Sequence, residues 1–142
     1  MQSNLPVRNA ETSAAVRTAR FLFALLAWSF VACLTVQVYF AGMATFSDAT
    51  HWELHRSFVK LFAFAPLLLF ILAWIARLPV KLRWIALVSF ALVIFQFLTV
   101  QLFASVRMLA SLHPVVALAL FWAALAMVKG SIRASAGSSG HA

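Results

Sequence analysis

The sequence predicts an all-α membrane protein, a polytopic four-helix up-down bundle built from two repeated helical hairpins. Three observations carry this prediction: the composition, four long apolar runs and an internal repeat. Of the 142 residues, 65% are hydrophobic and only 10% are charged, and the mean hydropathy is +1.00. A soluble domain carries about 25% charged residues. The chain is therefore better suited to lipid than to water.

Each of the four apolar runs is long enough to cross a bilayer. A spanning helix needs about 20 apolar residues, with a range of roughly 17 to 25. The first run is too long for the apolar region of a signal peptide, which covers about 7 to 15 residues, so it is predicted to be a span. The runs cover residues 21–46, 57–76, 84–106 and 111–128.

The apolar runs divide the chain into three parts. Residues 1–19 are predicted to be a cytoplasmic N-terminal tail, 20–128 a four-helix transmembrane domain and 129–142 a cytoplasmic C-terminal tail. Both tails are rich in small and polar residues, which is typical of disorder. His141, in the second tail, is interpreted as a bystander.

The distribution of Lys and Arg predicts the orientation in the membrane. Eight basic residues fall on one side of the runs and three on the other, and the side with more faces the cytoplasm. The prediction is a multi-pass protein of the bacterial inner (plasma) membrane with both termini in the cytoplasm. The formal charge is +8, but the basic residues do not line one face of a helix. We therefore expect anionic membrane lipid rather than nucleic acid as the partner. The two sets are Arg8, Arg17, Arg20, Arg77, Lys81, Arg83, Lys129 and Arg133 against Arg56, Lys60 and Arg107.

An internal repeat relates the two halves of the chain. TVQVYFAG at residues 35–42 returns as TVQLFASV at 99–106, at equivalent places in the two hairpins. At about 1.5 Å per residue, Gln37 and Gln101 both reach roughly 25 Å from the inner face. Polar groups at such depth face the bundle interior by default and mark function. The alternative is that the two glutamines only hydrogen-bond across helices.

His51 and His55 are four residues apart and share a helix face if the helix already includes position 51. This spacing occurs in zinc sites of the H-E-x-x-H type. Here, however, Glu53 lies two residues from each histidine and off their face, and Cys33 is alone in its apolar run. Zinc is therefore the less favoured interpretation.

His55 and His113 open the second and fourth runs on the outer side. In an up-down bundle these helices are parallel and diagonal, so their side chains converge on the bundle axis. Two neutral imidazoles meeting there could be the axial ligands of a haem iron. The offset between the histidines is the difficulty. His55 lies 22 residues before Arg77 and His113 lies 16 before Lys129, a difference of about 9 Å that tilt or a longer inner end must absorb.

A haem between the two hairpins would match the repeat, and its propionates would need cations at the outer edge. Arg56, Lys60 and Arg107 are the candidates on that side. The chain has no C-x-x-C-H motif, so the predicted cofactor is a non-covalent haem b. As an alternative, each histidine taken singly reads as an amphipathic residue at the membrane interface, His113 opening a helix before Pro114.

Four helices with a histidine opening the second and fourth on the outer side resemble one half of the haem A synthase family. The resemblance covers residues 21–128 and is carried by the His55–Arg56 dipeptide, by His113 in L-H-P and by the repeat. Similar small bacterial four-helix membrane proteins share the arrangement. The family's second helix carries E-x-x-H-R, whereas Glu53 here lies two residues before His55. The resemblance implies haem ligation by His55 and His113, but not the oxygenation of a haem methyl group, because the family's enzymes have two such halves.

The sequence thus predicts a b-type haem protein with bis-histidine ligation near the outer face, including Gln37 and Gln101 in the cofactor layer. Its expected role is electron transfer, haem sensing or haem carriage, rather than catalysis, alone or with a redox partner or larger membrane complex. The main alternative is a cofactor-free membrane scaffold or accessory subunit. A small transporter using Gln96 and the other layer residues is least favoured, because no span contains a carboxylate. The sequence gives no oligomeric state.

Overall fold

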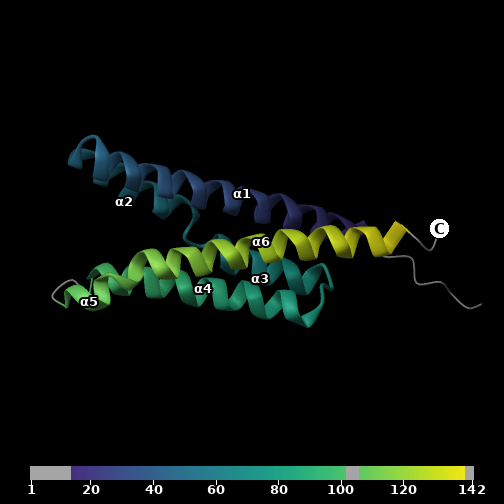
Figure 1. Ribbon diagram of the computed structural model, residues 1–142. Coiled ribbons are helices and arrows are strands. Elements are labelled where there is room, and N and C mark those ends of the chain that lie inside the picture. The colour runs from purple at the N-terminus through teal and green to yellow at the C-terminus, as the bar shows by residue number, and fades with distance from the viewer. Residues whose placement is uncertain (1–13, 102–105, 140–142) are drawn as a thin grey trace, which may run out of the picture.

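The structure is a computed structural model that describes residues 14–101 and 106–139. Within these residues all regular secondary structure is helical, and the long helices lie side by side along one axis (Figure 1). The elements are α1 (Ala14–Phe46), η1 (Ala49–His51), α2 (Trp52–Phe62), α3 (Ala65–Ile75), α4 (Val80–Gln101), α5 (Arg107–Ala110) and α6 (Leu112–Ser139).

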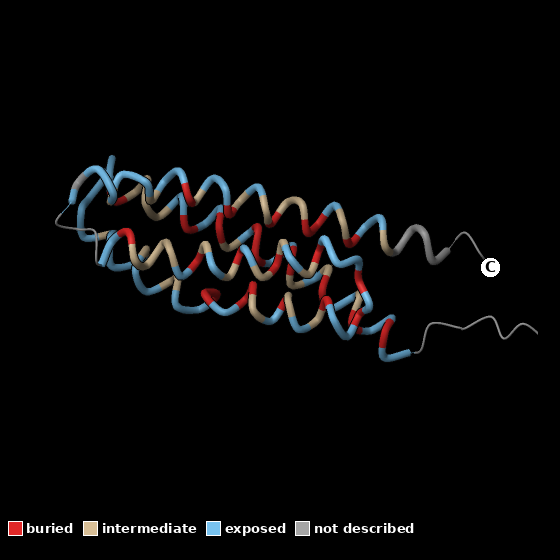
Figure 2. The backbone as a smooth tube through the Cα atoms, turned by 90° about the horizontal axis from the view of Figure 1, so that it is seen from below, coloured by how far each residue is buried: buried red, intermediate tan, exposed pale blue. Residues whose placement is uncertain are grey.

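The predicted all-α bundle with four spans is confirmed. Four helical segments of the described chain are long and apolar enough to cross a membrane, α2 and α3 together forming the second. Most residues along these segments are not buried within the protein (Figure 2). The exposed ones include large apolar side chains such as Phe21, Trp84 and Trp122. Such a surface needs lipid around it. The protein is therefore a multi-pass membrane protein that contacts lipid. The spans are Ala14–Phe46, Ala49–Ile75, Val80–Gln101 and Met108–Ala134.

The second span is broken rather than continuous. α2 ends at Phe62 and α3 begins at Ala65, with Pro66 in its first turn. Proline has no N–H to donate, and its ring clashes with the carbonyl four residues earlier, here that of Phe62. The sequence pattern treated this stretch as one apolar run, but the proline divides it into two helices. We name the two ends of the bundle after the predicted orientation: the end that holds η1 and α2 is the outer end, and the end where α3 finishes is the inner end.

The two helical pieces have different neighbours. α2 packs against α1 and η1 at the outer end, whereas α3 packs against α1 and α4 in the inner half. α6 packs against both α1 and α4. The inner half is therefore a four-helix bundle, while the outer half of the first hairpin stands further from the second hairpin (Figure 1).

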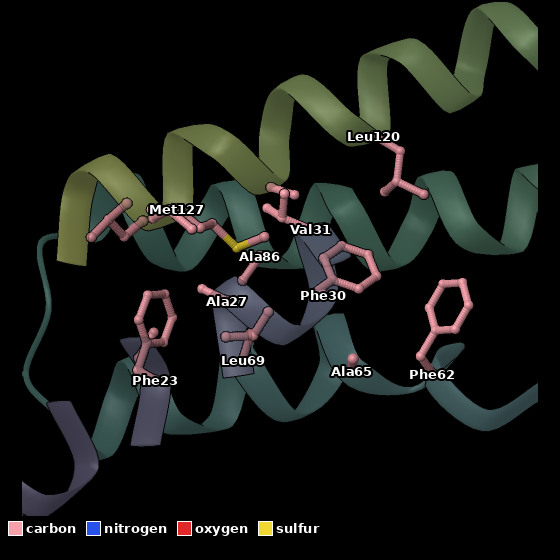
Figure 3. Close-up of a cluster of buried hydrophobic side chains, with 14 of the residues drawn as sticks. Phe23, Ala27, Phe30, Val31, Phe62, Ala65, Leu69, Ala86, Leu120 and Met127 are labelled. Carbon is pink, nitrogen blue, oxygen red and sulfur yellow. The ribbon is translucent and has the colours of Figure 1, made fainter. Parts of the chain in front are cut away.

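The core is built from large side chains set against alanines. Phe23 and Met127 are fully buried beside Ala27 and Ala86 (Figure 3). Small residues let helix backbones approach closely. In lipid the hydrophobic effect does not drive helices together, so this close van der Waals packing drives their association. At the inner end of α6, Gly130 faces Leu82 of α4, and a methyl group at that position would lie 2.8 Å from Leu82 Cδ1.

The inner end of α3 is closed by a Schellman motif. The N–H of Leu78 donates to Ala73 O at 3.0 Å and the N–H of Arg77 donates to Trp74 O at 3.1 Å. The motif requires a left-handed residue, usually glycine. Here that residue is Arg77, with φ 53°.

Arg20 of α1 connects three helices at this same end. Its Nε donates to Ala76 O, at the end of α3, at 3.2 Å, and its Nη1 donates to Ala134 O of α6 at 3.5 Å. At Ala76 the cation lies at the C-terminus of α3, where carbonyls are left without partners, whereas Ala134 lies within α6, before its end at Ser139. Ala76 and Ala134 therefore mark a common inner level.

The helices extend beyond the predicted domain boundaries. α1 begins at Ala14, inside the segment predicted to be a tail, and α6 runs to Ser139, eleven residues beyond Val128. The prediction of a disordered tail from 129 onwards is wrong up to that point, because alanine and the basic residues there continue a helix. Arg8 and His141 lie outside the described residues.

Candidate functional site

The structure brings His55 of α2 and His113 of α6 together at the outer end. Their ring centroids are 6.3 Å apart and the ring planes are inclined by 57°. Both residues are half-buried. The two histidines that open the second and fourth spans therefore form one ring pair, which we call the histidine pair.

Gln37 of α1 holds His55 from two sides. The Gln37 side-chain amide donates from Nε2 to His55 O at 2.8 Å, and Gln37 O lies 3.1 Å from His55 Nδ1. Gln37 is itself buried, with 9% of its surface exposed. This reciprocal contact fixes both the backbone position and the ring orientation of His55.

Thr99 of α4 plays the corresponding part for His113. Thr99 Oγ1 lies 3.0 Å from His113 Nδ1 and donates to Gln96 O at 2.7 Å. Thr99 is 0% exposed. With its hydrogen directed to Gln96 O, the hydroxyl oxygen can accept from Nδ1 of His113.

The partners of the two rings differ in what they impose. A backbone carbonyl can only accept, so Nδ1 of His55 carries the hydrogen and, in the neutral ring, Nε2 has the lone pair. The Thr99 hydroxyl is compatible with either tautomer of His113, and the tautomer with the hydrogen on Nδ1 leaves Nε2 of that ring as an acceptor too. In that state each ring has one nitrogen held by a neighbour and one able to bind a metal.

The inner level defined by Arg20 accounts for the expected offset of about 9 Å between the histidines. His55 lies 21 residues before Ala76, and His113 lies 21 residues before Ala134. Lys129 is not at the inner level, because α6 continues past it. The two histidines thus stand at equal height, and the longer inner end of α6 is the reason.

Aromatic side chains surround the pair on the side of the first hairpin. The Trp52 ring meets His55 edge-on, with centroids 5.5 Å apart. One turn deeper, Phe58 contacts Phe40 at 5.3 Å and Phe62 at 5.4 Å. An aromatic cluster on α1 and α2 therefore lies one turn below His55, and Trp52 is the aromatic residue in contact with the pair itself.

The other predicted site residues lie away from the pair. Arg56 is paired with Glu53 on the exposed face of α2, and Lys60 is exposed on the same helix. Gln101 is exposed too. The side chain of Arg107 lies outside what the structure describes.

One residue of the site was missed in the sequence. Thr99 belongs to the second copy of the repeat, where attention falls on Gln101, whereas Gln96, one turn before Thr99, was considered only for the transporter hypothesis. The place of Thr99 in the repeat could have identified it. A threonine in a transmembrane helix needs a polar partner for its hydroxyl group, and a histidine on a neighbouring helix can be that partner. The two hairpins therefore use different repeat positions, Gln37 in one and Thr99 in the other.

Two buried oxygens near the pair have no hydrogen-bond partner: Gln37 Oε1 and Gln96 Oε1. Leaving a buried acceptor unsatisfied costs about 1–3 kcal/mol. Within the described residues there is no group of three or more His, Cys, Asp and Glu that could enclose a metal ion. The layer thus offers two imidazole nitrogens and two amide oxygens, all of them acceptors.

A family model described as a family of unknown function, DUF6220, matches residues 37–104. The match covers just under half of the chain and includes Gln37, His55 and Thr99, but it ends before His113. No curated protein and no solved structure matches the chain. The similarity to this family therefore names no activity.

Proposed function

We propose that the protein is an integral-membrane b-type haem protein in which His55 and His113 would both hold the haem iron. It would be a multi-pass protein of the bacterial inner membrane with both termini cytoplasmic, serving electron transfer or haem sensing and carriage. The observation that carries the proposal is the histidine pair, in which Nδ1 of each ring already lies at a hydrogen-bond partner.

The spacing of the pair fits one metal centre between the rings. A metal–imidazole bond is about 2.0–2.1 Å long, taking zinc as the reference. Two such bonds in line, with half a ring added at each end, give a centroid separation of the order of the 6.3 Å observed. The apolar surroundings of Phe40 and Phe58 suit the faces of a macrocycle.

The chain's own residues have distinct parts in such a site. His55 and His113 would hold the iron, and Gln37 and Thr99 orient them by accepting the Nδ1 hydrogens. A bound haem supplies one-electron chemistry, which the protein tunes through its ligands and their hydrogen bonds. For the propionates, the cations offered on the outer side are Lys60, Arg107 and Arg56, the last of which is paired with Glu53.

A visible spectrum of purified protein tests the proposal. Wild type reconstituted with haem should show low-spin bands in the reduced-minus-oxidised spectrum. His55→Ala and His113→Ala should each give high-spin haem or none. His51→Ala is the matched control, because His51 lies in η1, four residues before His55, and it should keep the low-spin bands.

The double variant His55→Ala/His113→Ala should bind no haem yet still insert, because insertion depends on the apolar spans. Absence of low-spin bands in wild type would rule out the cytochrome assignment and leave a cofactor-free scaffold. Loss of the bands in His51→Ala alone would mean that the wrong histidine has been assigned.

A further inference from the structure

The histidine pair and two amide side chains form a layer rich in acceptors. Gln37 donates to His55 O, which points toward the inner end of α2, and Gln96 lies one turn below Thr99 on α4. Both amides therefore belong to the level just beneath the rings. Four acceptor atoms, the two Nε2 and the two Oε1, call for an electron-poor occupant.

We propose that, without haem, this layer binds a bare divalent transition-metal ion. His55 Nε2 and His113 Nε2 are its protein ligands, and water completes the coordination. The metal-bound water donates its hydrogens to Gln37 Oε1 and Gln96 Oε1, the two buried oxygens without a partner. The proposal rests on the same histidine pair as the proposed function, but not on haem.

The donor set selects the class of ion. Imidazole nitrogen suits zinc, copper, nickel and iron, whereas magnesium and calcium prefer carboxylate and carbonyl oxygen. A metal ion also makes its bound water more acidic and so a stronger donor. This explains why two amide oxygens are kept buried beside the pair, which iron held in a macrocycle does not by itself require.

The position of the amide oxygens separates them from the ligands. As partners of the water rather than of the metal, they act on affinity indirectly. Partners of this kind change metal affinity by about 10- to 100-fold when they are removed. Gln96 is the cleaner test of the two, because Gln37 also supports the backbone of His55.

Cobalt titration of protein prepared without haem tests the proposal. Co²⁺ is the probe, because its visible absorption reports nitrogen and oxygen coordination directly. Wild type should bind one equivalent, and His55→Ala and His113→Ala should lose the site. Gln96→Leu should bind Co²⁺ about 10- to 100-fold more weakly. Gln101→Leu is the matched control, since that glutamine is exposed, and it should bind as wild type does.

Gln96→Asn keeps the amide but moves it back by one methylene, so its affinity for Co²⁺ should be intermediate. Because it preserves a polar side chain, it also provides a result if Gln96→Leu fails to fold. Equal Co²⁺ affinity in wild type, Gln96→Leu and Gln96→Asn overturns the proposal, as does a wild type that binds no Co²⁺. The two proposals fail separately: missing low-spin haem bands leave the cobalt result standing, and a missing cobalt site leaves the haem result standing.

Discussion

At the scale of single residues, the two histidines are held with unequal strength. His55 is fixed through its ring and its backbone by one buried glutamine. The ring of His113 contacts the hydroxyl of Thr99, which is itself directed to Gln96 O. The chemistry of the pair is therefore more sensitive to Thr99 than its neutral side chain suggests.

Replacing Thr99 should test this dependence. Thr99→Val keeps the shape but removes the acceptor for Nδ1 of His113, so haem affinity should fall by about 10-fold or more. Thr99→Ser restores the hydroxyl and should recover most of the affinity. Haem titration, followed by the low-spin band, measures both. If Val and Ser behave alike, the hydroxyl does not orient His113.

At the scale of the helices, the inner ends are shaped by close backbone geometry. α3 stops in a Schellman motif whose left-handed position is occupied by arginine, and α6 approaches α4 at a glycine. The positive φ of Arg77 is a source of backbone strain, and the contact at Gly130 leaves no room for a larger side chain. A single substitution at either position should therefore change stability in a direction that can be predicted. The two features support two predictions on stability.

Arg77→Gly should raise the free energy of unfolding by about 1 kcal/mol, because glycine adopts positive φ without steric cost. Arg77→Ala is the control, since it removes the same charge but keeps the side-chain penalty, and it should bring no gain. Thermal unfolding in detergent compares the three proteins. Equal stability of the Gly and Ala variants would show that charge, not backbone, decides.

The two glycines within α1 and α6 should respond oppositely to alanine. A methyl group at Gly42 has nothing within 4 Å, so Gly42→Ala should stabilise the helix by up to about 1 kcal/mol. Gly130→Ala should destabilise by about 1–3 kcal/mol, because its methyl group meets Leu82. Leu82→Ala should relieve part of that loss in the double variant. Additive effects would mean that the two side chains do not meet.

At the scale of the whole molecule, the charged residues are distributed unevenly between the two ends. Among the described residues, Arg20, Arg77 and Arg83 lie at the inner end without a carboxylate, whereas the outer end has Arg56 and Lys60 together with both carboxylates, Asp48 and Glu53. The Thr50 backbone N–H donates to Asp48, which lowers the pKa of that carboxyl. This asymmetry supports the proposed orientation with the inner end in the cytoplasm.

Cysteine labelling in intact cells should reveal the orientation. With Cys33 replaced by alanine, a cysteine at Ser47, in the exposed outer turn, should react with an impermeant reagent. A cysteine at Lys81, exposed at the inner start of α4, should react only after the membrane is opened. The reverse pattern would place the histidine pair on the cytoplasmic side.

The sequence was sufficient for the number of spans and for the approach of His55 to His113. Apolar length alone predicts the four spans, because lipid requires every backbone group to be satisfied within a helix. The diagonal placement of His55 and His113 follows from the up-down order. Their equal height could not be predicted, because it depends on Arg20 bonding to carbonyls 56 and 114 residues away.

The supporting residues were harder to foresee. Gln37 and Gln101 are equivalent in the repeat, yet only Gln37 faces the interior and Thr99 serves the second histidine. Which face of a helix is buried depends on packing angles that a three-residue identity does not fix. Pro66 was visible in the sequence, but the resulting division of labour between α2 and α3 arises from their different neighbours.

The Arg20 contacts have a consequence for bilayer thickness. From Arg20 to Phe46, α1 rises about 39 Å, whereas the hydrocarbon layer measures about 30 Å. Because Arg20 connects the inner end of α1 to α3 and α6, the extra length of α1 lies at its outer end. There the helix must tilt or protrude from the hydrocarbon layer. We therefore expect the histidine pair, about 32 Å above Ala76 and Ala134, to lie at the lipid–water boundary. The exposure of the two rings to water should then decrease as the surrounding membrane becomes thicker.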